Sequence, residues 1–573
     1  MRPFILTDLQ AGKLPRLALI VLCLLYALPG LIGRDPWRVA DAADFGVALT
    51  MVRGDLNDWL LPNLVGLPIH HEGPLAYWLY ALPARIVWFA PAHVVVCLAA
   101  AMLLGLSFVA FWYGAYSLAR RHGVQPDDPF GASASPVDYG RAVADSALLI
   151  LLASFGLLIR MHETTVAASQ VLWVSVFLFG TAIAIDNPRR GGLIAGLAIA
   201  ALGMTRDPAY AVALLLCLLT LCTVSQPFRL VARSLLLHAL LCALGLLVLW
   251  PALLWLAGGD YRRYLLAWLA VGTNAYGVPT KTVLLYLVRT SPWFFWPAWP
   301  IALWAAYRWR SRLSEPAVAL PLCALASLSL LALLSPRADE LMLLPIAPPL
   351  ALLAAMGLPT LKRGVVSLID WFAVTTFTLF GIAVWAYWIA MMTGTPAKMA
   401  VRAVALAGGS RPAFTTIEFV FGVLASLAWL WLVKWRISRQ PRMVWRAVAL
   451  SSAGLVLAWF LLMTLWLPVF DQRNTYRELS MRVAKALPPD YGCINSKSLE
   501  PAERASLAYF GSIRFAEQAP TFESTACNYL LVQDDGPIAQ SIRPGEPGWD
   551  YLWEGRRKND PSQRMRLYRR QMR

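Results

Sequence analysis

The segment Gly33–Trp78 reads GRDPWRVADAADFGVALTMVRGDLNDWLLPNLVGLPIHHEGPLAYW. Three aspartates, Asp35, Asp41 and Asp44, stand near its start, and the run His70-His71-Glu72 stands near its end. An apolar run precedes the segment and a very apolar protein follows it. Charged groups beside a membrane core are costly, so a cluster of them at this place predicts a functional site.

The composition is that of a polytopic membrane protein. Of 573 residues, 58% are hydrophobic and only 14% are charged, and a soluble protein has no use for so much apolar surface. The 25 tryptophans suit membrane–water interfaces. A formal charge of +17 would favour nucleic-acid binding in a soluble protein. Here the basic residues form short clusters between apolar runs, which indicates topology signals, and we expect no nucleic-acid partner.

Runs of about 20 apolar residues predict about thirteen transmembrane helices. The predicted spans lie near 15–33, 92–118, 143–159, 166–185, 191–205, 208–225, 234–257, 293–308, 316–334, 341–358, 365–391, 414–434 and 445–467. The segment 74–90 is apolar but short and interrupted by proline, which predicts a re-entrant or interfacial helix. The apolar run 17–31 has no small-residue cleavage site after it, so we expect an uncleaved anchor.

If the chain has thirteen spans, every basic cluster between spans falls on the same side of the membrane. The positive-inside rule identifies that side as the cytoplasm. The segment 34–91, the segment 258–292 and the tail from about 468 then face outward. We therefore predict two domains, a membrane domain over 1–467 with its functional loop at 34–91, and an outward α/β domain over 468–573. In the tail, 476–487 has helical spacing, whereas 528–532 and 565–568 resemble strands.

The cysteines fall into two groups. Six lie in apolar runs and are predicted to be inert packing residues. Cys493 and Cys527 both lie in the polar tail, and they are predicted to form a disulfide if that tail is outside the cytoplasm. No spacing of cysteine and histidine indicates a structural zinc site.

The first-loop acids suit proton transfer. Asp41 and Asp44 are three positions apart and share one face of a helix predicted over 40–53. A carboxylate near a helix N-terminus is held ionised, so Asp41 is predicted to act as a general base or electrostatic anchor for a polar substrate at the membrane surface. The alternative is helix capping and solvated charge. His71 and Glu72 could hold a metal ion or simply anchor the loop through hydrogen bonds.

Several arginines lie at predicted outward positions, against the general charge trend. They are Arg160, Arg206, Arg262 and Arg337. Because a guanidinium binds phosphate in a bidentate manner, these residues could recognise a lipid phosphate at the headgroup level. Most of them have an acidic residue within three positions, so local ion pairs are the alternative.

These motifs resemble polytopic glycosyltransferases of the GT-C type, which include the bacterial lipid A aminoarabinose transferase and the protein O-mannosyltransferases. The resemblance lies in the first outer loop, which has a Trp, an acid, a Gly-Asp turn, a W-x-x-P-x-x-x-G-L run and a Glu-x-Pro motif before an aromatic pair. The matching residues are Trp37–Asp41, Phe45-Gly46, Gly54-Asp55, Trp59–Leu67, Glu72-Gly73-Pro74 and Tyr77-Trp78. Weaker matches are Thr205–Pro208 and Asp339–Leu350.

Some residues depart from the family pattern. The family's acidic pair is here a single acid, Asp41, with Asp44 further on, and the family's lysine after the loop glutamate is Gly73. A second family lysine is replaced by Arg206. Phosphate recognition is therefore predicted to be rearranged. If the family's metal site uses the loop glutamate, Glu72 matches it, although no histidine in 258–292 completes such a site.

The resemblance implies an enzyme of the bacterial inner membrane with its active site and C-terminal domain in the periplasm. The donor would be a sugar on a polyprenyl phosphate such as undecaprenyl phosphate, and the acceptor a lipid A or lipopolysaccharide, another glycolipid or a polysaccharide. Inversion at the anomeric carbon would involve Asp41 as catalytic residue and Asp44 as supporting acid, with Arg206, Arg337 and Arg262 holding the lipid phosphate. No cofactor is certain, and a divalent metal remains open. Protein O-mannosylation, transport of a lipid-linked sugar and a non-catalytic scaffold are the alternatives.

Overall fold

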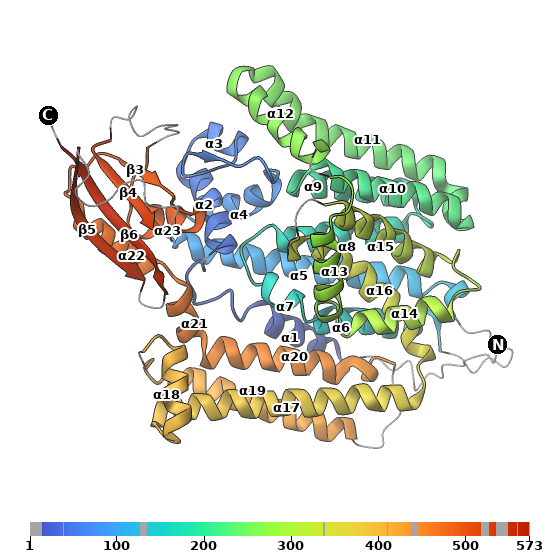
Figure 1. The fold of residues 1–573 in the computed structure, drawn as a ribbon. Helices are drawn as coiled ribbons and strands as arrows, with labels where there is room; N and C mark the ends of the chain where they lie inside the picture. The colour runs from blue at the N-terminus through green and yellow to red at the C-terminus, as the bar shows by residue number, and fades with distance from the viewer. Residues whose placement is uncertain are drawn as a thin grey trace.

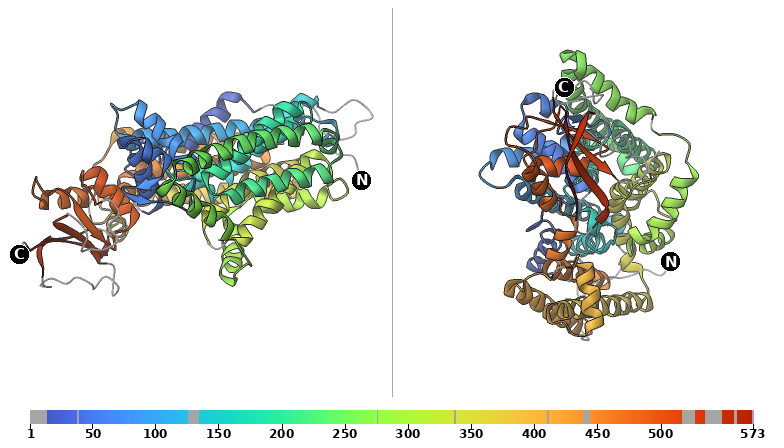
Figure 2. Two further views of the ribbon diagram at one scale, coloured as in Figure 1. Left: turned by 90° about the horizontal axis from the view of Figure 1, so that it is seen from above. Right: turned by 60° about the vertical axis from the view of Figure 1, so that its left-hand side comes forward.

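The computed structural model is a long helical bundle with a small sheet-containing domain at one end (Figure 1). It describes residues 14–37, 39–125, 134–274, 276–335, 338–409, 411–437, 444–516, 527–534, 548–557 and 560–571. The statements below concern these residues. Seen from above, the sheet-containing domain extends beyond one end of the helical bundle (Figure 2, left).

Each of the thirteen predicted spans coincides with a helix. These are α1 (Arg16–Ala27), α5 (Ala92–Ala119), α6 (Pro136–Ala153), α8 (Ala167–Ile183), α9 (Pro188–Thr205), α10 (Pro208–Val224), α11 (Gln226–Ala257), α14 (Ala298–Arg308), α15 (Pro316–Leu334), α16 (Ala347–Gly357), α17 (Arg363–Thr393), α19 (Thr416–Ile437) and α20 (Arg446–Leu465). By length and composition alone, 7 helices in the described ranges are suited to crossing a membrane. The predicted fold class is confirmed, and the number of spans stays a prediction.

Short elements connect the long helices. In the first loop, α2 (Ala40–Arg53) and α3 (Leu56–Leu60) precede a small hairpin of β1 (Asn63–Leu64) and β2 (Leu67–Pro68), and α4 (Leu75–Ile86) follows with Pro83 inside it. Further along the chain come α7 (Leu157–Arg160), α12 (Gly259–Asn274), α13 (Lys281–Phe294) and α18 (Ala397–Leu406). Helices α2, α3, α4, α12 and α18 lie at the end of the bundle that carries the C-terminal domain (Figure 1).

The C-terminal domain is a small α/β unit, as predicted. Helix α21 (Leu467–Asn474) leads into it, followed by α22 (Arg477–Ala486), β3 (Ile494–Lys497), α23 (Pro501–Phe510), β4 (Tyr529–Asp534), β5 (Trp549–Arg557) and β6 (Asp560–Arg570). The sheet order is β3-β4-β6-β5, in which β3 and β4 are parallel and the other pairs antiparallel.

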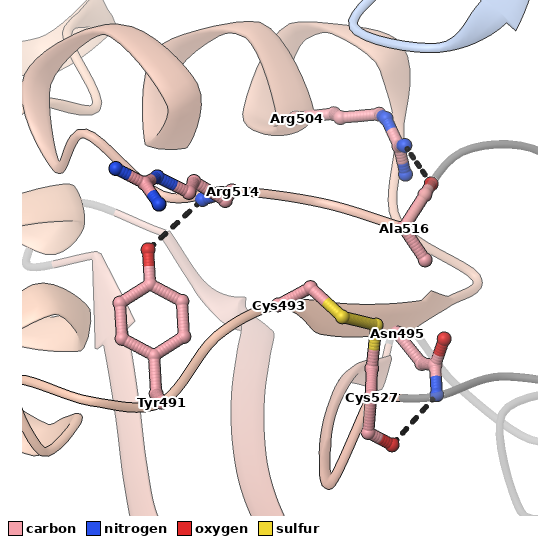
Figure 3. The surroundings of a disulfide bond; sticks show 7 residues. All are labelled: Tyr491, Cys493, Asn495, Arg504, Arg514, Ala516 and Cys527. Atoms are coloured by element: carbon pink, nitrogen blue, oxygen red, sulfur yellow. Dashed lines mark hydrogen bonds between the residues drawn. A yellow bond between two sulfur atoms is a disulfide. The ribbon is translucent and has the colours of Figure 1, made fainter.

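A disulfide joins Cys493 and Cys527 (Figure 3). Cys493 immediately precedes β3 and Cys527 lies two residues before the start of β4, and the parallel pairing of these strands begins with Ile494 opposite Tyr529. Their Cα atoms are 5.1 Å apart, within the range that a disulfide requires. The bond therefore links the starts of these two strands.

The C-terminal domain packs directly on the first loop. A Cβ placed on Gly46 of α2 would lie 2.4 Å from the Cβ of Ala505 in α23, so only a glycine permits this approach. Arg504 donates to the carbonyl of Val65 at 2.8 and 3.0 Å, and Arg53 donates to that of Ala508 at 3.0 Å. Helix α2, which carries Asp41 and Asp44, is thus held between the bundle and the C-terminal domain.

Candidate functional site

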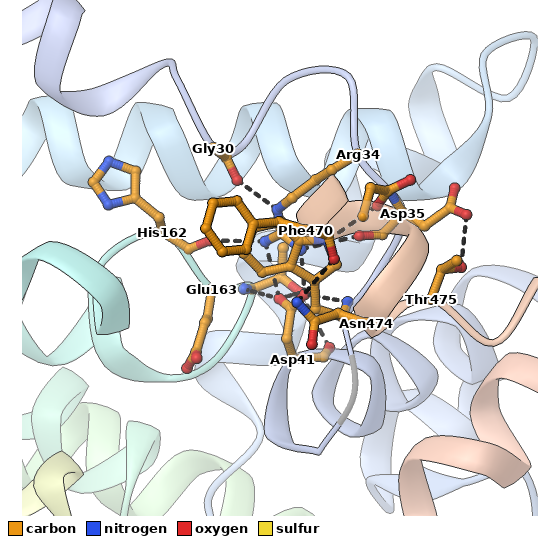
Figure 4. Close-up of polar contacts among 12 residues, drawn as sticks. Gly30, Arg34, Asp35, Asp41, His162, Glu163, Phe470, Asn474 and Thr475 are labelled. Carbon is orange, nitrogen blue, oxygen red and sulfur yellow. Dashed lines mark hydrogen bonds and ion pairs between the residues drawn. The ribbon is translucent and has the colours of Figure 1, made fainter. Parts of the chain in front are cut away.

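A buried ion pair fixes the start of α2 (Figure 4). Arg34 donates to Asp41 at 2.5 Å, and both side chains are almost completely buried, Asp41 being 1% exposed. Arg34 also donates to the carbonyl oxygens of Gly30 and His162. The guanidinium therefore ties three separate segments of the chain together at one carboxylate.

The remaining acceptor positions of Asp41 are also occupied. Its carboxylate accepts from the backbone N–H of Trp37 at 2.7 Å and from the N–H and hydroxyl of Thr164 at 2.5 and 2.7 Å. Burial alone would raise the pKa of Asp41, but the charge and hydrogen bonds of Arg34, together with the two N–H donors, hold it below its usual value. A carboxylate in this state is a poor proton acceptor and a good structural anchor.

Asp44 is in a different environment, one turn further along α2. It is half-buried, and its Oδ1 lies 3.3 Å from the hydroxyl of Tyr77 in α4. The same hydroxyl donates to Glu72 at 2.5 Å, so Tyr77 lies between two carboxylates. Arg206 donates to the other oxygen of Glu72 at 2.8 Å. We call Asp44, Glu72, Tyr77 and Arg206 the carboxylate cluster.

The cluster is electrostatically suited to accepting a proton. Loss of water around the Asp44 carboxylate and the negative charge of Glu72 raise the pKa of Asp44 well above its usual value, against the opposing hydrogen bond from Tyr77 and charge of Arg206. A base is most effective when its pKa approaches the working pH, and an upward shift moves an aspartate in that direction. In the function proposed below, we therefore assign the role of general base to Asp44 and not to Asp41.

Local sequence explains how Arg206 reaches the cluster. It follows α9 directly, and Asp207 caps α10 by accepting from the N–H of Ala209 at 2.9 Å, with Pro208 in the first turn. Arg206 forms its ion pair with Glu72 and not with Asp207, the local alternative. Asp207 is engaged by this cap and by the hydroxyl of Tyr276 at 2.9 Å. The indole of Trp268 in α12 donates to the Arg206 carbonyl at 3.3 Å.

Gly73 sets the position of Glu72. A Cβ at residue 73 would lie 2.0 Å from the carbonyl oxygen of Met204, so a side chain cannot fit at this position. The N–H of Gly73 donates to the carbonyl of Thr205 at 3.3 Å. This contact places Glu72 beside Arg206. The guanidinium of Arg206 is therefore the positive charge next to Glu72.

The residues around Glu72 do not suit a metal ion. Both oxygens of Glu72 are engaged by Arg206 and Tyr77, and His71 is exposed while Glu72 is buried. In the described parts of the chain, no three side chains of His, Cys, Asp or Glu gather into a ligand set. A metal site usually needs at least three such ligands, so no step below depends on a metal.

Arg262, one of the predicted phosphate-binding arginines, is not a member of the carboxylate cluster. Arg262 is exposed on α12 and stacks over Trp255, 3.5 Å from the ring centroid, away from the carboxylate cluster. Arg337 lies outside the described residues. Arg160 pairs with Glu163 at 3.0 Å and with Glu340 at 2.7 Å, and burial raises the pKa of Glu163 to about 7.

A second polar network was not predicted from the sequence. Arg477, at the start of α22, pairs with Asp35, and Thr475 donates to Asp35 at 2.8 Å. Asp471 accepts from the N–H of Asp35 at 2.9 Å and from the indole of Trp37 at 3.0 Å. These residues are separated by more than 400 positions, so only the three-dimensional fold reveals that the helix leading to the tail grips the first loop.

The fold is similar to that of ArnT, whose structure is known with and without a bound lipid. The structure of ArnT from Cupriavidus metallidurans bound to undecaprenyl phosphate superposes with a TM-score of 0.66 and 14% identity over 96% of this chain and 97% of that one. The apo form of ArnT gives a TM-score of 0.60 and 16% identity over 87% and 84%. No family model matches the sequence, and no curated protein matches it.

An archaeal oligosaccharyltransferase, AglB from Archaeoglobus fulgidus, is more distant, with a TM-score of 0.42 and 13% identity over 86% of this chain and 64% of that one. The ArnT-like fold and the long apolar helices together make this chain a multi-pass membrane protein. The predicted resemblance is confirmed at the level of the fold.

Proposed function

We propose that this protein is a membrane glycosyltransferase that moves a sugar from a polyprenyl phosphate to a lipid or glycan acceptor. The observation that carries the proposal is the carboxylate cluster, in which a half-buried aspartate of raised pKa stands close to a buried arginine–glutamate pair. The ArnT structure of the same fold holds undecaprenyl phosphate, which supports a donor of this class.

Asp44 serves as the general base in this proposal. Its carboxylate takes the proton of an acceptor hydroxyl or amine as the acceptor oxygen or nitrogen attacks the anomeric carbon. The bond between that carbon and the phosphate oxygen breaks, the polyprenyl phosphate leaves with the electron pair, and the configuration inverts. No nucleotide is consumed.

Arg206 is the cation whose charge acts on Asp44, and it serves to stabilise the negative charge on the leaving phosphate. Burial alone would lower the pKa of the Arg206 guanidinium, but the negative charges of Glu72 and Asp207 raise it and keep the group protonated. Gln170 supports it from α8, where the amide oxygen accepts from the Arg206 Nε at 3.1 Å and the amide nitrogen donates to the Leu341 carbonyl at 2.9 Å. A preorganised cation of this kind needs no rearrangement during the reaction.

The same proposal places the cluster and the C-terminal domain on the outward, periplasmic face of the bacterial inner membrane. The basic clusters between the predicted spans support this orientation. The membrane domain over 1–467 would carry out the chemistry, and the domain over 468–573 would cover the first loop.

The test uses the purified protein in lipid vesicles with undecaprenyl phosphate carrying a radiolabelled sugar and lipopolysaccharide as the acceptor. A transferase converts the label into acceptor product and releases free undecaprenyl phosphate. Movement of intact donor across the vesicle membrane, with no cleavage of the sugar–phosphate bond, would instead identify a transporter.

A further inference from the structure

A groove of about 890 Å³ opens between α17, α18 and the junction of α20 with α21. Among the described residues that line it are two arginines, Arg402 of α18 and Arg473 of α21, and no acidic residue. Helix α18 lies on the opposite side of the bundle from α12, so the groove is separate from the carboxylate cluster (Figures 1 and 2). The walls are apolar and include Phe380, Ala383, Val384, Leu462 and Trp466.

Neither arginine of the groove is neutralised by the protein. Both side chains are exposed, and neither forms an ion pair or a hydrogen bond with any residue that the structure describes. Asp471, the acid nearest to Arg473 in the sequence, instead accepts from the N–H of Asp35 and from the indole of Trp37. Because the two guanidinium groups come from different helices and line one groove, they present their charge to the same occupant.

Helix α18 is unusually basic for its position. Lys398 and Arg402 are four positions apart, so they share one exposed face, and like charges at this spacing destabilise a helix. The segment 394–413 also contains Arg411 and has no acidic residue. It belongs to a predicted outward loop, where basic residues are usually scarce. A helix of this kind, basic on one face and packed on α17 by the other, is typical of helices that lie on anionic membrane surfaces.

The groove runs from the arginines into the depth of the membrane. Its α17 wall extends from Phe380 to Tyr387, within a helix that is suited to crossing a membrane and ends at Thr393. Phe380 is about 20 Å from that end, at 1.5 Å per residue, whereas Arg402 belongs to the short helix that follows it. An anion held by the arginines therefore has an apolar wall beside it on the membrane side. This arrangement suits a lipid and not a free phosphate ion.

The groove is also connected to the first loop. Phe470 and Arg473 of α21 line it, and Asp471 between them holds Asp35 and Trp37 at the start of that loop. Helix α21 thus has the groove on one side and the first loop on the other. An occupant of the groove would support the helix that grips the loop.

We propose that this groove binds an anionic phospholipid, with its phosphate between Arg402 and Arg473 and one acyl chain along α17. Guanidinium groups bind phosphate oxygens well, and their uncompensated charge favours a lipid of net negative charge over a zwitterionic one. The apolar walls suit the chain. The lipid is a bound component of the fold and not a substrate, so the inference stands or fails independently of the proposed function.

The test titrates the full-length protein in a neutral detergent with phosphatidylglycerol or with phosphatidylcholine of the same acyl chains, and counts bound lipid by native mass spectrometry. The wild type is expected to bind phosphatidylglycerol about 30-fold more tightly, which is about fivefold for each arginine. Arg402→Gln and Arg473→Gln should each lose about fivefold of this preference, and the double variant should lose nearly all of it.

The matched control is Arg289→Gln, an exposed arginine of α13 that does not line the groove. It should keep the preference of the wild type. Unfolding midpoints of the lipid-free proteins are measured first and should agree, because all three positions are exposed. Equal affinity of the wild type for the two lipids, or a preference that survives the double variant, would overturn the inference.

A second variant tests the acyl chain. Ala383 is an exposed wall residue, and Ala383→Trp fills the groove without changing its charge. It should weaken binding of phosphatidylglycerol about tenfold, the loss of roughly two buried CH₂ groups. Unchanged affinity would show that the chain does not lie in the groove. Displacement of phosphatidylglycerol by an equal amount of undecaprenyl phosphate would assign the groove to the sugar carrier, and either result would overturn the choice of occupant.

Discussion

Two aspartates three positions apart in one helix have opposite electrostatic situations. The Asp41 carboxylate is buried in an ion pair with Arg34 and accepts three further hydrogen bonds, whereas Asp44 is half-buried next to a second carboxylate. Their pKa values are shifted in opposite directions. Pairs of acids whose pKa values are driven apart by their surroundings usually have different roles.

The anchoring role of Asp41 predicts a folding defect. Asp41→Asn leaves Arg34 charged and buried without its partner, which should lower the free energy of unfolding by about 3–5 kcal/mol. Thermal unfolding of the purified protein in detergent checks this. Because the pKa of Asp41 is lowered in the folded protein, its contribution is complete above about pH 4, the unfolded value. The difference between variant and wild type should narrow as the pH falls below that value. An Asp41→Asn protein as stable as the wild type at neutral pH would contradict the anchoring role.

The coupling of Asp44 to Glu72 predicts a shift in the pH dependence of transfer. A base with a raised pKa becomes protonated, and the rate falls, at a higher pH than an ordinary aspartate would require. Glu72→Gln removes the negative neighbour, so the pKa of Asp44 should fall and the acid limb of the kcat/KM profile should move to lower pH. The variant should also lose rate at its optimum, because Arg206 loses its partner. An acid limb that stays in place would show that another group titrates.

At the scale of elements, the close contact of α2 with α23 depends on Gly46. Gly46→Ala places its new methyl group 2.4 Å from the Cβ of Ala505, and the strain should cost about 1–3 kcal/mol of stability. The double variant Gly46→Ala with Ala505→Gly should recover most of this loss, because the next nearest atom, the Ala505 Cα, lies at 3.4 Å. Thermal unfolding of the wild type, the two single variants and the double variant provides the cycle. Equal destabilisation in the single and double variants would mean that α23 does not dock on α2 in solution.

The same scale shows which features the sequence could predict. The apolar runs located every long helix, and the alternation and turn residues of the tail located α22, β4 and β6. Ion pairs between distant segments could not be predicted, because no local pattern records them. The sequence offered Asp207 as the alternative partner of Arg206, yet Arg206 pairs with Glu72, 134 positions away.

The loop acids were recognised as a group, but their separate roles were not. Arg34 determines which of the two aspartates forms a buried ion pair. Arg34 also donates to the carbonyl of His162, which is 128 positions away in the sequence. Spacing along a helix shows that Asp41 and Asp44 share a face. It does not show that one meets a buried guanidinium and the other a buried carboxylate.

At the scale of the whole molecule, the parts around the carboxylate cluster come from one end of the bundle (Figure 1). The first loop brings Asp44 and Glu72, the junction of α9 and α10 brings Arg206, and α12 covers them with Trp268. The C-terminal domain contacts α2 through α23. It also contacts the segment before α2, through the ion pair of Arg477 with Asp35. A lipid-borne substrate arrives at a fixed depth, so a base and a cation held rigidly at one depth are what such a reaction requires.

The most direct measurement is the rate of sugar transfer from labelled undecaprenyl phosphate by Asp44→Asn. Asp260→Asn, an exposed aspartate of α12, serves as the matched control, and all proteins are compared at equal amounts of folded material. We predict that Asp44→Asn binds the donor, keeps the stability of the wild type and loses about 10²–10⁴ in kcat, the usual worth of a general base. The control should keep the wild-type rate. An Asp44→Asn enzyme that turns over at the wild-type rate would contradict the assignment of the carboxylate cluster as the site of transfer.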